Sequence, residues 1–326
     1  FNLVICALPY ASVIIASTRR PQLLRLALNG LTKQTYSDFE CILVIKDFND
    51  AYSKVIDEFS KKLDISVIEQ RTGYVTTALN IGLRQARGQI VAFLDDDAIP
   101  ETTWLESHIK TYALFEKVGG VAGKVVETKI ENGLFEPLQR EPVAANLRWF
   151  LVWPIDPLKG YSTYLTRGGL IYSYGNQEYF EKVLRSRIFS SMLWFGANMS
   201  ILKKAFGSYV INETRVMGLH FEQEIAYLLF KKSYRVLCNL EAVVFHLIRK
   251  ETLSRFYQST FKCAQFEAEK QLFYYILKKS FKAPISPAFK LVTSTAVAMR
   301  CLSQTRRNSA KFALSRFLGI LTGNMM

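Results

Sequence analysis

Three consecutive aspartates at the end of a short apolar run constrain this chain more than any other feature of its sequence. The run Ile90–Leu94 is too short to be anything but a buried strand. In an open α/β sheet, ligands bind at the carboxyl ends of strands, where Asp95, Asp96 and Asp97 would lie. Three adjacent carboxylates repel one another, and a divalent cation such as Mg²⁺ or Mn²⁺, shared with substrate phosphates, relieves that repulsion.

The same acids have a simpler interpretation. Asp96 or Asp97 could cap a helix that starts near Pro100, because aspartate is a preferred N-cap residue and proline a preferred first residue of a helix. The aspartates alone leave both interpretations open.

Apolar strands alternate with helices along the chain. The apolar pattern predicts strands at residues 13–16, 40–45, 65–69, 90–94, 120–127, 234–237 and 242–245, and a return to ordered structure at 192–202. It predicts helices at residues 22–33, 51–62, 77–86, 104–117 and 222–232. This alternation is typical of an α/β fold with a mostly parallel sheet. Residues 131–188, rich in proline, glycine and aromatic residues, indicate an irregular insertion, a kind of segment that tends to be functional.

Cysteine usage and hydropathy favour a protein on the cytoplasmic side of a membrane. The five cysteines are scattered without a CxxC pair, which predicts reduced structural thiols rather than disulfides or a zinc site. No stretch reaches the roughly 18–20 apolar residues that span a bilayer. The apolar opening run lacks the preceding basic region of a signal peptide.

Positive charge is concentrated in the last part of the chain. Residues 249–326 carry fourteen Lys or Arg and three Glu, so they account for +11 of the net charge of +14. Aromatic residues are frequent in the same segment, such as Phe256, Tyr257, Phe273 and Tyr274. A basic helical extension with an apolar face predicts contact with anionic lipid headgroups, whereas packing of at least one of its helices on the main domain is the plainer interpretation.

Several motifs, taken in order and with their spacing, resemble the inverting family-two nucleotide-sugar glycosyltransferases of GT-A fold. The resemblance runs from about Ala11 to His246. Its motifs are SVIIASTRRP at 12–21, KQTY at 33–36, ALNIG at 78–82, ARGQIVAFLDDD at 86–97 and FGANM at 195–199. The resemblance implies a GT-A domain over residues 1–248, with a nucleotide-sugar half at about 11–127 and an acceptor half at about 128–248. Residues 249–326 would then form the helical, basic, aromatic-rich extension.

The resemblance also implies a donor site with a divalent metal, Mn²⁺ or Mg²⁺. Asp97 would be the direct metal ligand. Asp95 would hold the ribose or a metal-bound water, or serve as a further metal ligand, and Asp96 would bind the donor or cap a helix. His246 matches a position where some relatives place a third metal ligand, although a histidine at a strand end is often a structural hydrogen-bonding residue. The remaining donor-binding residues implied by the resemblance are Ser17, Thr18, Asp47 and Asn80.

Asp47 marks a departure from the family pattern. The family usually has two acids at the exit of the second strand, whereas this chain has Lys46 and Asp47. The nucleobase of the donor is therefore left open.

The acceptor side is implied by a second set of residues. An acceptor hydroxyl needs a base, and alignment with the family places Glu222 at the catalytic acid position, where relatives more often have Asp. Glu222 and Glu224 could instead complement the dipole of the helix they open. The resemblance also places Trp194, Asn198 and Glu224 on the acceptor side, together with Phe195.

These features together predict a metal-dependent inverting glycosyltransferase at the inner face of the cell membrane. Its partners would be a nucleotide-diphosphate sugar, a glycan or lipid-linked acceptor and an anionic membrane surface, with no nucleic acid. One alternative is transfer to a polyprenyl phosphate, which is already ionised and needs no base. Another, of a different class, is a nucleic-acid or anionic-surface binding module that uses the basic extension.

Overall fold

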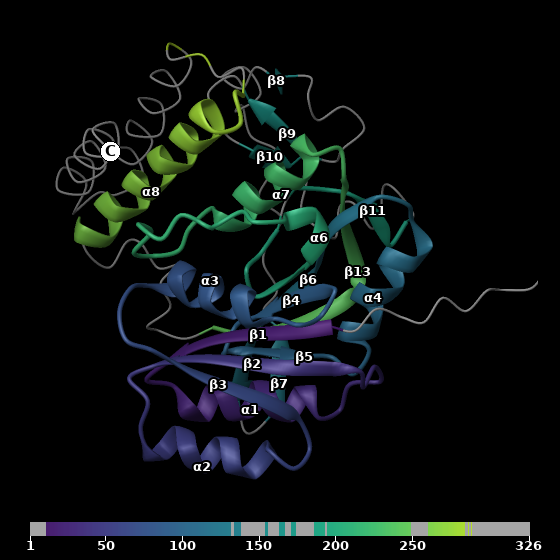
Figure 1. Cartoon of the computed structure of the whole chain (residues 1–326), viewed down its shortest axis with the longest axis vertical. Helices are drawn as coiled ribbons and strands as arrows, with labels where there is room; N and C mark the ends of the chain where they lie inside the picture. Colours follow the sequence, from purple (N-terminus) through teal and green to yellow (C-terminus); the bar gives the residue numbers. More distant parts are fainter. Residues whose placement is uncertain are drawn as a thin grey trace, which may run out of the picture.

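The fold is built around one ten-stranded sheet with helices on both faces (Figure 1). A computed structural model describes residues 11–131, 134–137, 154–155, 163–166, 171–173, 186–192, 194–248, 260–283, 286 and 288. The main path of the sheet runs β11-β13-β6-β12-β4-β1-β2-β3, with β5 paired to β13 and β7 paired to β6.

The first half of the sheet is parallel, as the alternating pattern predicts. Its strands, in the spatial order β4-β1-β2-β3, are β1 (Ala11–Thr18), β2 (Phe39–Lys46), β3 (Asp64–Gln70) and β4 (Ile90–Leu94). The helices that connect them are α1 (Pro21–Leu31), α2 (Asp50–Phe59) and α3 (Val75–Gln85). Because these strands are parallel, their carboxyl ends, including the end of β4, lie at one edge of the sheet.

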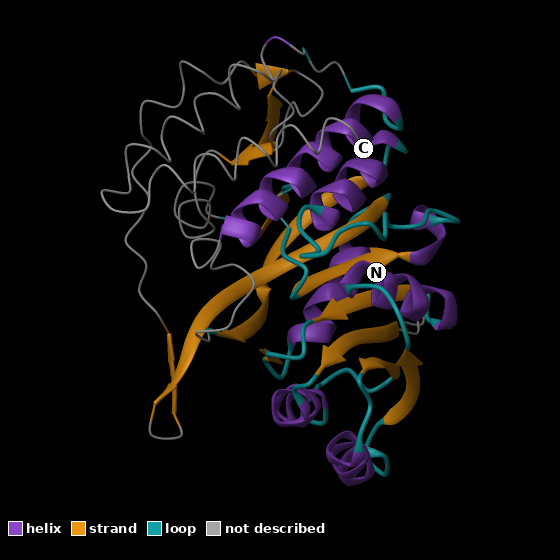
Figure 2. Ribbon diagram, turned by 90° about the vertical axis from the view of Figure 1, so that its left-hand side faces the viewer, coloured by secondary structure: helices purple, strands orange, loops and turns teal. Residues whose placement is uncertain are grey.

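The second half of the sheet is mixed. Its strands are β5 (Ala98–Pro100), β6 (Val118–Glu131), β7 (Leu134–Pro137), β11 (Ile188–Ser190), β12 (Asn198–Leu202) and β13 (Arg235–Leu247). β12 lies antiparallel between β4 and β6, and β13 runs parallel to β6. The β6–β7 hairpin extends away from the body of the molecule (Figure 2).

Alternate residues of each central strand face opposite layers, as the pleat of a strand requires. Val13 and Ile15 in β1 pack with α1, α2 and α4 (Trp104–Leu114), whereas Ile14 faces α3 and the helices of the second half. Those helices are α6 (Lys203–Phe206), α7 (Phe221–Lys231) and α8 (Thr260–Lys279). One apolar core therefore packs against each face of the sheet.

The helix predicted at residues 104–117 is α4, which begins at Trp104 with Thr103 at its N-cap, so no helix starts near Pro100 in this described part of the chain. Residues 98–100 instead form β5, which pairs with β13. The helix-cap interpretation of Asp96 and Asp97 is therefore wrong, since the two acids precede a strand rather than a helix.

Two expectations about other segments fall partly outside the described residues. Within the insertion at 131–188, the described parts include a small sheet in the order β10-β9-β8, formed by β8 (Pro154–Ile155), β9 (Thr163–Thr166) and β10 (Ile171–Ser173). In the extension, α8 packs on the main core through Leu272, Phe273 and Leu277, whereas most of residues 284–326 lies outside the described part. Division of the chain at residue 248 stays a prediction. None of the helices described here combines the length and the apolarity that crossing a bilayer requires.

A buried carboxylate ties the first strands together at their amino ends. Glu40 in β2 is 2% exposed and accepts hydrogen bonds from Ser12 Oγ, from the Arg87 backbone N–H and from Arg87 Nε, each 2.7 Å long. Burial alone would raise the pKa of Glu40, but these hydrogen bonds and the charge of Arg87 hold it below its ordinary value. This cluster lies at the end of the sheet opposite the aspartates.

Replacement of Glu40 by Ala should lower the free energy of unfolding by about 1–3 kcal/mol, because it removes the acceptor of the buried Ser12 hydroxyl and of the partly buried Arg87 backbone N–H. Urea unfolding followed by circular dichroism measures the change. Glu58→Ala is the matched control, since its ion pair with Arg25 is exposed and should contribute little. Equal losses in the two variants would contradict this interpretation of Glu40.

Candidate active site

The three aspartates form the turn between β4 and β5, and strand pairing brings a distant histidine to them. β5 pairs antiparallel with β13, with His246 opposite Ala98. The backbone N–H of Leu247 donates to the carbonyl oxygen of Asp97, with an N to O distance of 2.9 Å. The end of β13 is thereby fixed against the aspartate turn, although about 150 residues separate the two in sequence.

Asp95, Asp97 and His246 form a compact cluster of potential metal ligands. One ligand atom from each lies within 4.8 Å of the other two. His246 Nε2 is 3.2 Å from Asp97 Oδ1 and 3.8 Å from Asp95 Oδ2. Two carboxylates and one imidazole, gathered this closely, could hold a divalent cation such as Mn²⁺.

The electrostatics of the cluster reflect this crowding. The pKa of Asp95 is raised mainly because surrounding protein atoms displace water from its carboxyl, and secondly because the Asp97 carboxylate repels its charge. Burial alone would lower the pKa of His246, but its hydrogen bond with Asp97 and the charges of Asp97 and Asp95 raise it. Each group thus shifts in the direction that reduces the net negative charge of the cluster.

Asp96 is not part of this cluster and is held by β1 and the residues that follow it. It is 3% exposed, and its carboxylate accepts hydrogen bonds from Ser17 Oγ at 2.7 Å and from Arg20 Nη1 at 3.1 Å. Ser17 also shares a 2.8 Å hydrogen bond with Tyr52 Oη. Burial raises the pKa of Asp96 to about 6, and Arg20 opposes the shift. Asp96 therefore joins β1 to the aspartate turn.

Arg20 is a residue whose role sequence reasoning missed. Its guanidinium binds Asp96 and lies 3.8 Å from the Asp97 carboxylate. A signal was available, because an arginine directly after a strand that ends beside an acidic turn can neutralise that turn. The cluster is thus flanked by a fixed positive charge.

Two of the expected donor-binding residues lie at the exposed rim of the same sheet edge. Thr18 ends β1 opposite Lys46 at the end of β2, and Asp47 follows directly. Both Thr18 and Asp47 are exposed, and Asp47 forms a 2.7 Å ion pair with Arg19. Their positions fit a ligand that approaches the carboxyl ends of β1 and β2.

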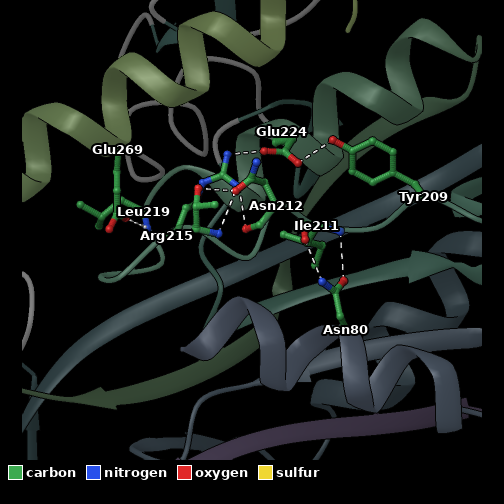
Figure 3. Close-up of polar contacts among 9 residues, drawn as sticks. Asn80, Tyr209, Ile211, Asn212, Arg215, Leu219, Glu224 and Glu269 are labelled. Atoms are coloured by element: carbon green, nitrogen blue, oxygen red, sulfur yellow. Dashed lines mark hydrogen bonds and ion pairs between the residues drawn. The ribbon is translucent and has the colours of Figure 1, made fainter. Parts of the chain in front are cut away.

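Asn80 lies elsewhere, and its expected contact with the donor does not fit its position. It is 3% exposed. Its side chain donates to the Ile211 carbonyl oxygen at 2.7 Å and accepts from the Ile211 backbone N–H at 3.0 Å (Figure 3). Both polar atoms of the amide are thus engaged inside the protein, so Asn80 anchors the chain before α7 to α3.

Glu222 lies on the β12 side of the aspartate turn, whereas Arg20 follows β1 on the other side of β4. Because β12 pairs antiparallel with β4, with Asn198 opposite Leu94, the turn that precedes β12 lies beside Asp95. In that turn, Gly196 donates its backbone N–H to Glu222 Oε1, with an N to O distance of 3.2 Å. Burial raises the pKa of Glu222 to about 7, and the charge of Asp95 adds to the rise. The carboxyl is thus poised to accept a proton near neutral pH.

Three residues expected on the acceptor side are instead buried. Trp194 is 1% exposed and donates from Nε1 to the Ser191 carbonyl oxygen at 3.2 Å. The Glu224 carboxylate is fully buried, accepts a hydrogen bond from Tyr209 Oη at 2.6 Å and pairs with Arg215. Neither side chain has a surface left for an acceptor, so the structure gives both a structural role.

Asn198 is the third of these corrections. It is fully buried, and Oδ1 accepts from Trp104 Nε1 at 2.8 Å while Nδ2 donates to the carbonyl oxygens of Lys124 and Ala242. His108 Nε2 lies 2.9 Å from the same Oδ1. Asn198 thus joins α4, β6 and β13 behind the site, whereas Phe195, in the same turn, is 41% exposed.

Comparison with known proteins places this site in a family. The model of the family described as "Glycosyl transferase family 2" matches residues 12–187, more than half of the chain. The match includes β1 to β4 and the aspartates but ends before α7. Glycosyltransferase AglE of Haloferax volcanii is 34% identical over 109 residues, which cover 32% of this chain and 36% of that protein. The chain thus spans about a third of the length of this relative.

Solved structures with little sequence identity share the fold. The crystal structure of GalNAc-T7 with UDP, GalNAc and Mn²⁺ superposes with a TM-score of 0.60 at 14% identity, covering 97% of this chain and 55% of that one. The mannosyltransferase PcManGT of Pyrobaculum calidifontis, in complex with GDP-Man and Mn²⁺, gives a TM-score of 0.52 at 15% identity, covering 97% and 87%. The predicted GT-A fold is confirmed, and the chain belongs to glycosyl transferase family 2.

Proposed function

We propose that this glycosyltransferase is metal-dependent and inverting, and that it moves a sugar from a nucleotide-diphosphate sugar to a hydroxyl group of a glycan or lipid-linked acceptor. One observation carries the proposal. The cluster of Asp95, Asp97 and His246 and the carboxyl of Glu222 lie close together at one edge of the sheet. The cluster fits a cation, and Glu222 fits a proton acceptor.

The side chains of the cluster suit a divalent cation. Asp97 and His246 would hold it, with Asp95 as a third ligand or a contact to the ribose of the donor. A mixed oxygen and nitrogen donor set favours Mn²⁺ over Mg²⁺, which prefers oxygen ligands. A bound cation would stabilise the negative charge that grows on the leaving diphosphate. Arg20 adds a fixed positive charge beside Asp97.

Glu222 supplies the base in the proposed step. Its carboxylate takes the proton of the acceptor hydroxyl, and the acceptor oxygen forms a bond to the anomeric carbon. The bond from that carbon to the diphosphate oxygen breaks, and its electron pair leaves with the diphosphate. A single displacement of this kind inverts the anomeric carbon. Phe195, exposed beside Gly196, offers an apolar face for the acceptor sugar next to Glu222.

Thr18 and Asp47 are proposed to contact the nucleoside of the donor from the rim of β1 and β2. Ser17 contributes indirectly, since its hydroxyl positions Asp96. The nucleobase stays open between uracil, guanine and thymine, because Lys46 stands where the family usually has an acid. The two related structures were solved with different nucleotides, UDP and GDP-Man.

Metal dependence is tested by thermal-shift measurements with UDP, GDP and dTDP, each with and without Mn²⁺. We expect one diphosphate to stabilise the wild type only when Mn²⁺ is present. Asp97→Asn should weaken Mn²⁺ binding by at least about tenfold, because it removes a charged ligand. Asp96→Asn is the matched control and should keep the Mn²⁺-dependent shift, because Asp96 binds Ser17 and Arg20 and does not belong to the cluster. Equal shifts with and without Mn²⁺ would argue against the metal site.

The role of Glu222 is tested by the pH dependence of turnover. A base with a pKa raised to about 7 is mostly protonated below that pH, so the rate should rise with pH through about 7 and then level off. Glu222→Gln should reduce turnover by about 10²–10⁴-fold, with binding of donor and Mn²⁺ preserved. A variant that keeps most of its turnover would instead favour a polyprenyl phosphate acceptor, which needs no base.

We further propose that the C-terminal end of α8 contacts an anionic membrane surface at the inner face of the cell membrane. Lys278, Lys279 and Lys282 are exposed there, and the Tyr275 ring beside them is 40% exposed. Clustered lysines with an aromatic ring suit the headgroup region of a negatively charged bilayer.

Co-sedimentation with vesicles tests this surface. The protein should bind phosphatidylcholine vesicles only when they contain phosphatidylserine, and the binding should weaken as salt is raised. Replacing Lys278, Lys279 and Lys282 with Gln should reduce binding, whereas the same change at Lys61 and Lys62, exposed after the end of α2, should not. Retention on DNA without binding to vesicles would favour the nucleic-acid alternative.

A further inference from the structure

The start of α7 is an unusual piece of backbone. Residues 217–220, here called the entry segment, lead directly into the helix that carries Glu222. Two of them have a positive φ, +69° at Gly218 and +63° at His220. A Cβ at position 218 would lie 2.2 Å from Val75 Cγ1, so both the conformation and the space require glycine there. Such a segment persists only when its surroundings hold it.

A single carboxylate from α8 holds the entry segment. Glu269 is 2% exposed, and its Oε1 accepts the backbone N–H of Met217 at 2.6 Å while its Oε2 accepts that of Leu219 at 2.8 Å. Figure 3 shows Glu269 extending from α8 toward Leu219. Both oxygens thus bind donors on either side of Gly218, and hydrogen bonds to a charged acceptor are stronger than neutral ones.

A ring contact adds to this hold. The imidazole of His220 stacks on Phe273 of α8, one turn after Glu269, with ring centroids 5.5 Å apart and planes at 20°. α8 therefore contacts three of the four residues that precede α7.

The opposite side of the first turn of α7 is fixed by a buried ion pair. Arg215, fully buried, pairs with the Glu224 carboxylate, which also accepts a hydrogen bond from Tyr209 (Figure 3). Glu224 and Glu222 share one helical turn but face different surroundings. The first turn is thus held at Glu224 from one side and through the entry segment from the other, which leaves Glu222 directed at Gly196.

We propose that Glu269 is a positioning residue for catalysis: by holding the entry segment, it sets the place of the Glu222 carboxyl relative to the aspartate cluster. The inference rests on the proposed function, because it assigns Glu269 an effect on the step in which Glu222 acts. It also makes α8, in the C-terminal extension, a part of the active centre. A displacement of about 1 Å at a reacting group can reduce a rate by as much as about 100-fold, so a lost anchor would affect turnover before binding.

Glu269→Gln tests the proposal with a nearly isosteric change. The glutamine amide can still accept one of the two backbone N–H groups of Met217 and Leu219. Its NH2 group would face the other as a second donor, so that hydrogen bond would be lost. With the full chain, Mn²⁺ and the nucleotide sugar that stabilises the wild type, release of nucleoside diphosphate should fall at least about tenfold in kcat, with KM for the donor within about twofold. Hydrogen exchange of residues 217–224 should become faster. Glu269→Asp keeps the negative charge on a shorter side chain, so its kcat should lie between those of Glu269→Gln and the wild type. If Glu269→Gln does not fold, Glu269→Asp is the variant to measure.

Glu40→Gln is the matched control. Glu40 is also 2% exposed and also accepts backbone and side-chain hydrogen bonds, but it lies at the far end of the sheet. It should lower the melting temperature with kcat within about twofold of the wild type. Unchanged exchange of residues 217–224 in Glu269→Gln, or a loss of kcat no greater than in the control, would overturn the proposal. Absence of turnover by the wild type with every donor would count against the proposed function, while the exchange measurement would still decide whether Glu269 holds the entry segment.

Discussion

Repulsion among Asp95, Asp96 and Asp97 is the constraint on which the active-site edge of this protein depends. The structure separates the three charges by giving each a different environment. Asp96 turns toward Arg20 and Ser17, whereas Asp95 and Asp97 face His246. The separation relies on the pairing of β5 with β13, since without it no histidine would lie beside the turn. Strand pairing in the sheet therefore decides which charged side chains lie next to each aspartate.

The sequence predicts the parts of this arrangement that depend on local pattern. The buried strand before Asp95, the parallel β1 to β4 and the helix that carries Glu222 follow from apolar periodicity and turn residues. β5 could not be predicted, because three residues carry too little pattern and their partner strand is far away in sequence. The helix-cap interpretation of Asp96 and Asp97 fails for the same reason, because a proline by itself also matches the start of a helix.

Polar residues marked the limit of sequence reasoning in the site. Asn198, Asn80 and Glu224 belong to motifs close to the chemistry, so resemblance assigned them to ligands. Their burial depends on which strands and helices close over them, and composition does not encode that. Each forms hydrogen bonds or ion pairs with buried backbone or charged groups, and leaving such a buried polar atom unpaired would cost free energy.

The same edge connects stability with ligand binding. A carboxyl whose pKa is raised on folding binds its proton more tightly in the folded state, so its contribution to stability falls as pH rises from its ordinary pKa toward the raised one. Asp95, Asp96 and Glu222 all shift in this direction. At neutral pH these carboxyls therefore contribute less to stability than they do in acid, and a cation that binds Asp95 and Asp97 would restore part of that stability. Groups that repel one another stay in place only when the surrounding structure holds them. Glu269 and Arg215 supply such a hold around Glu222.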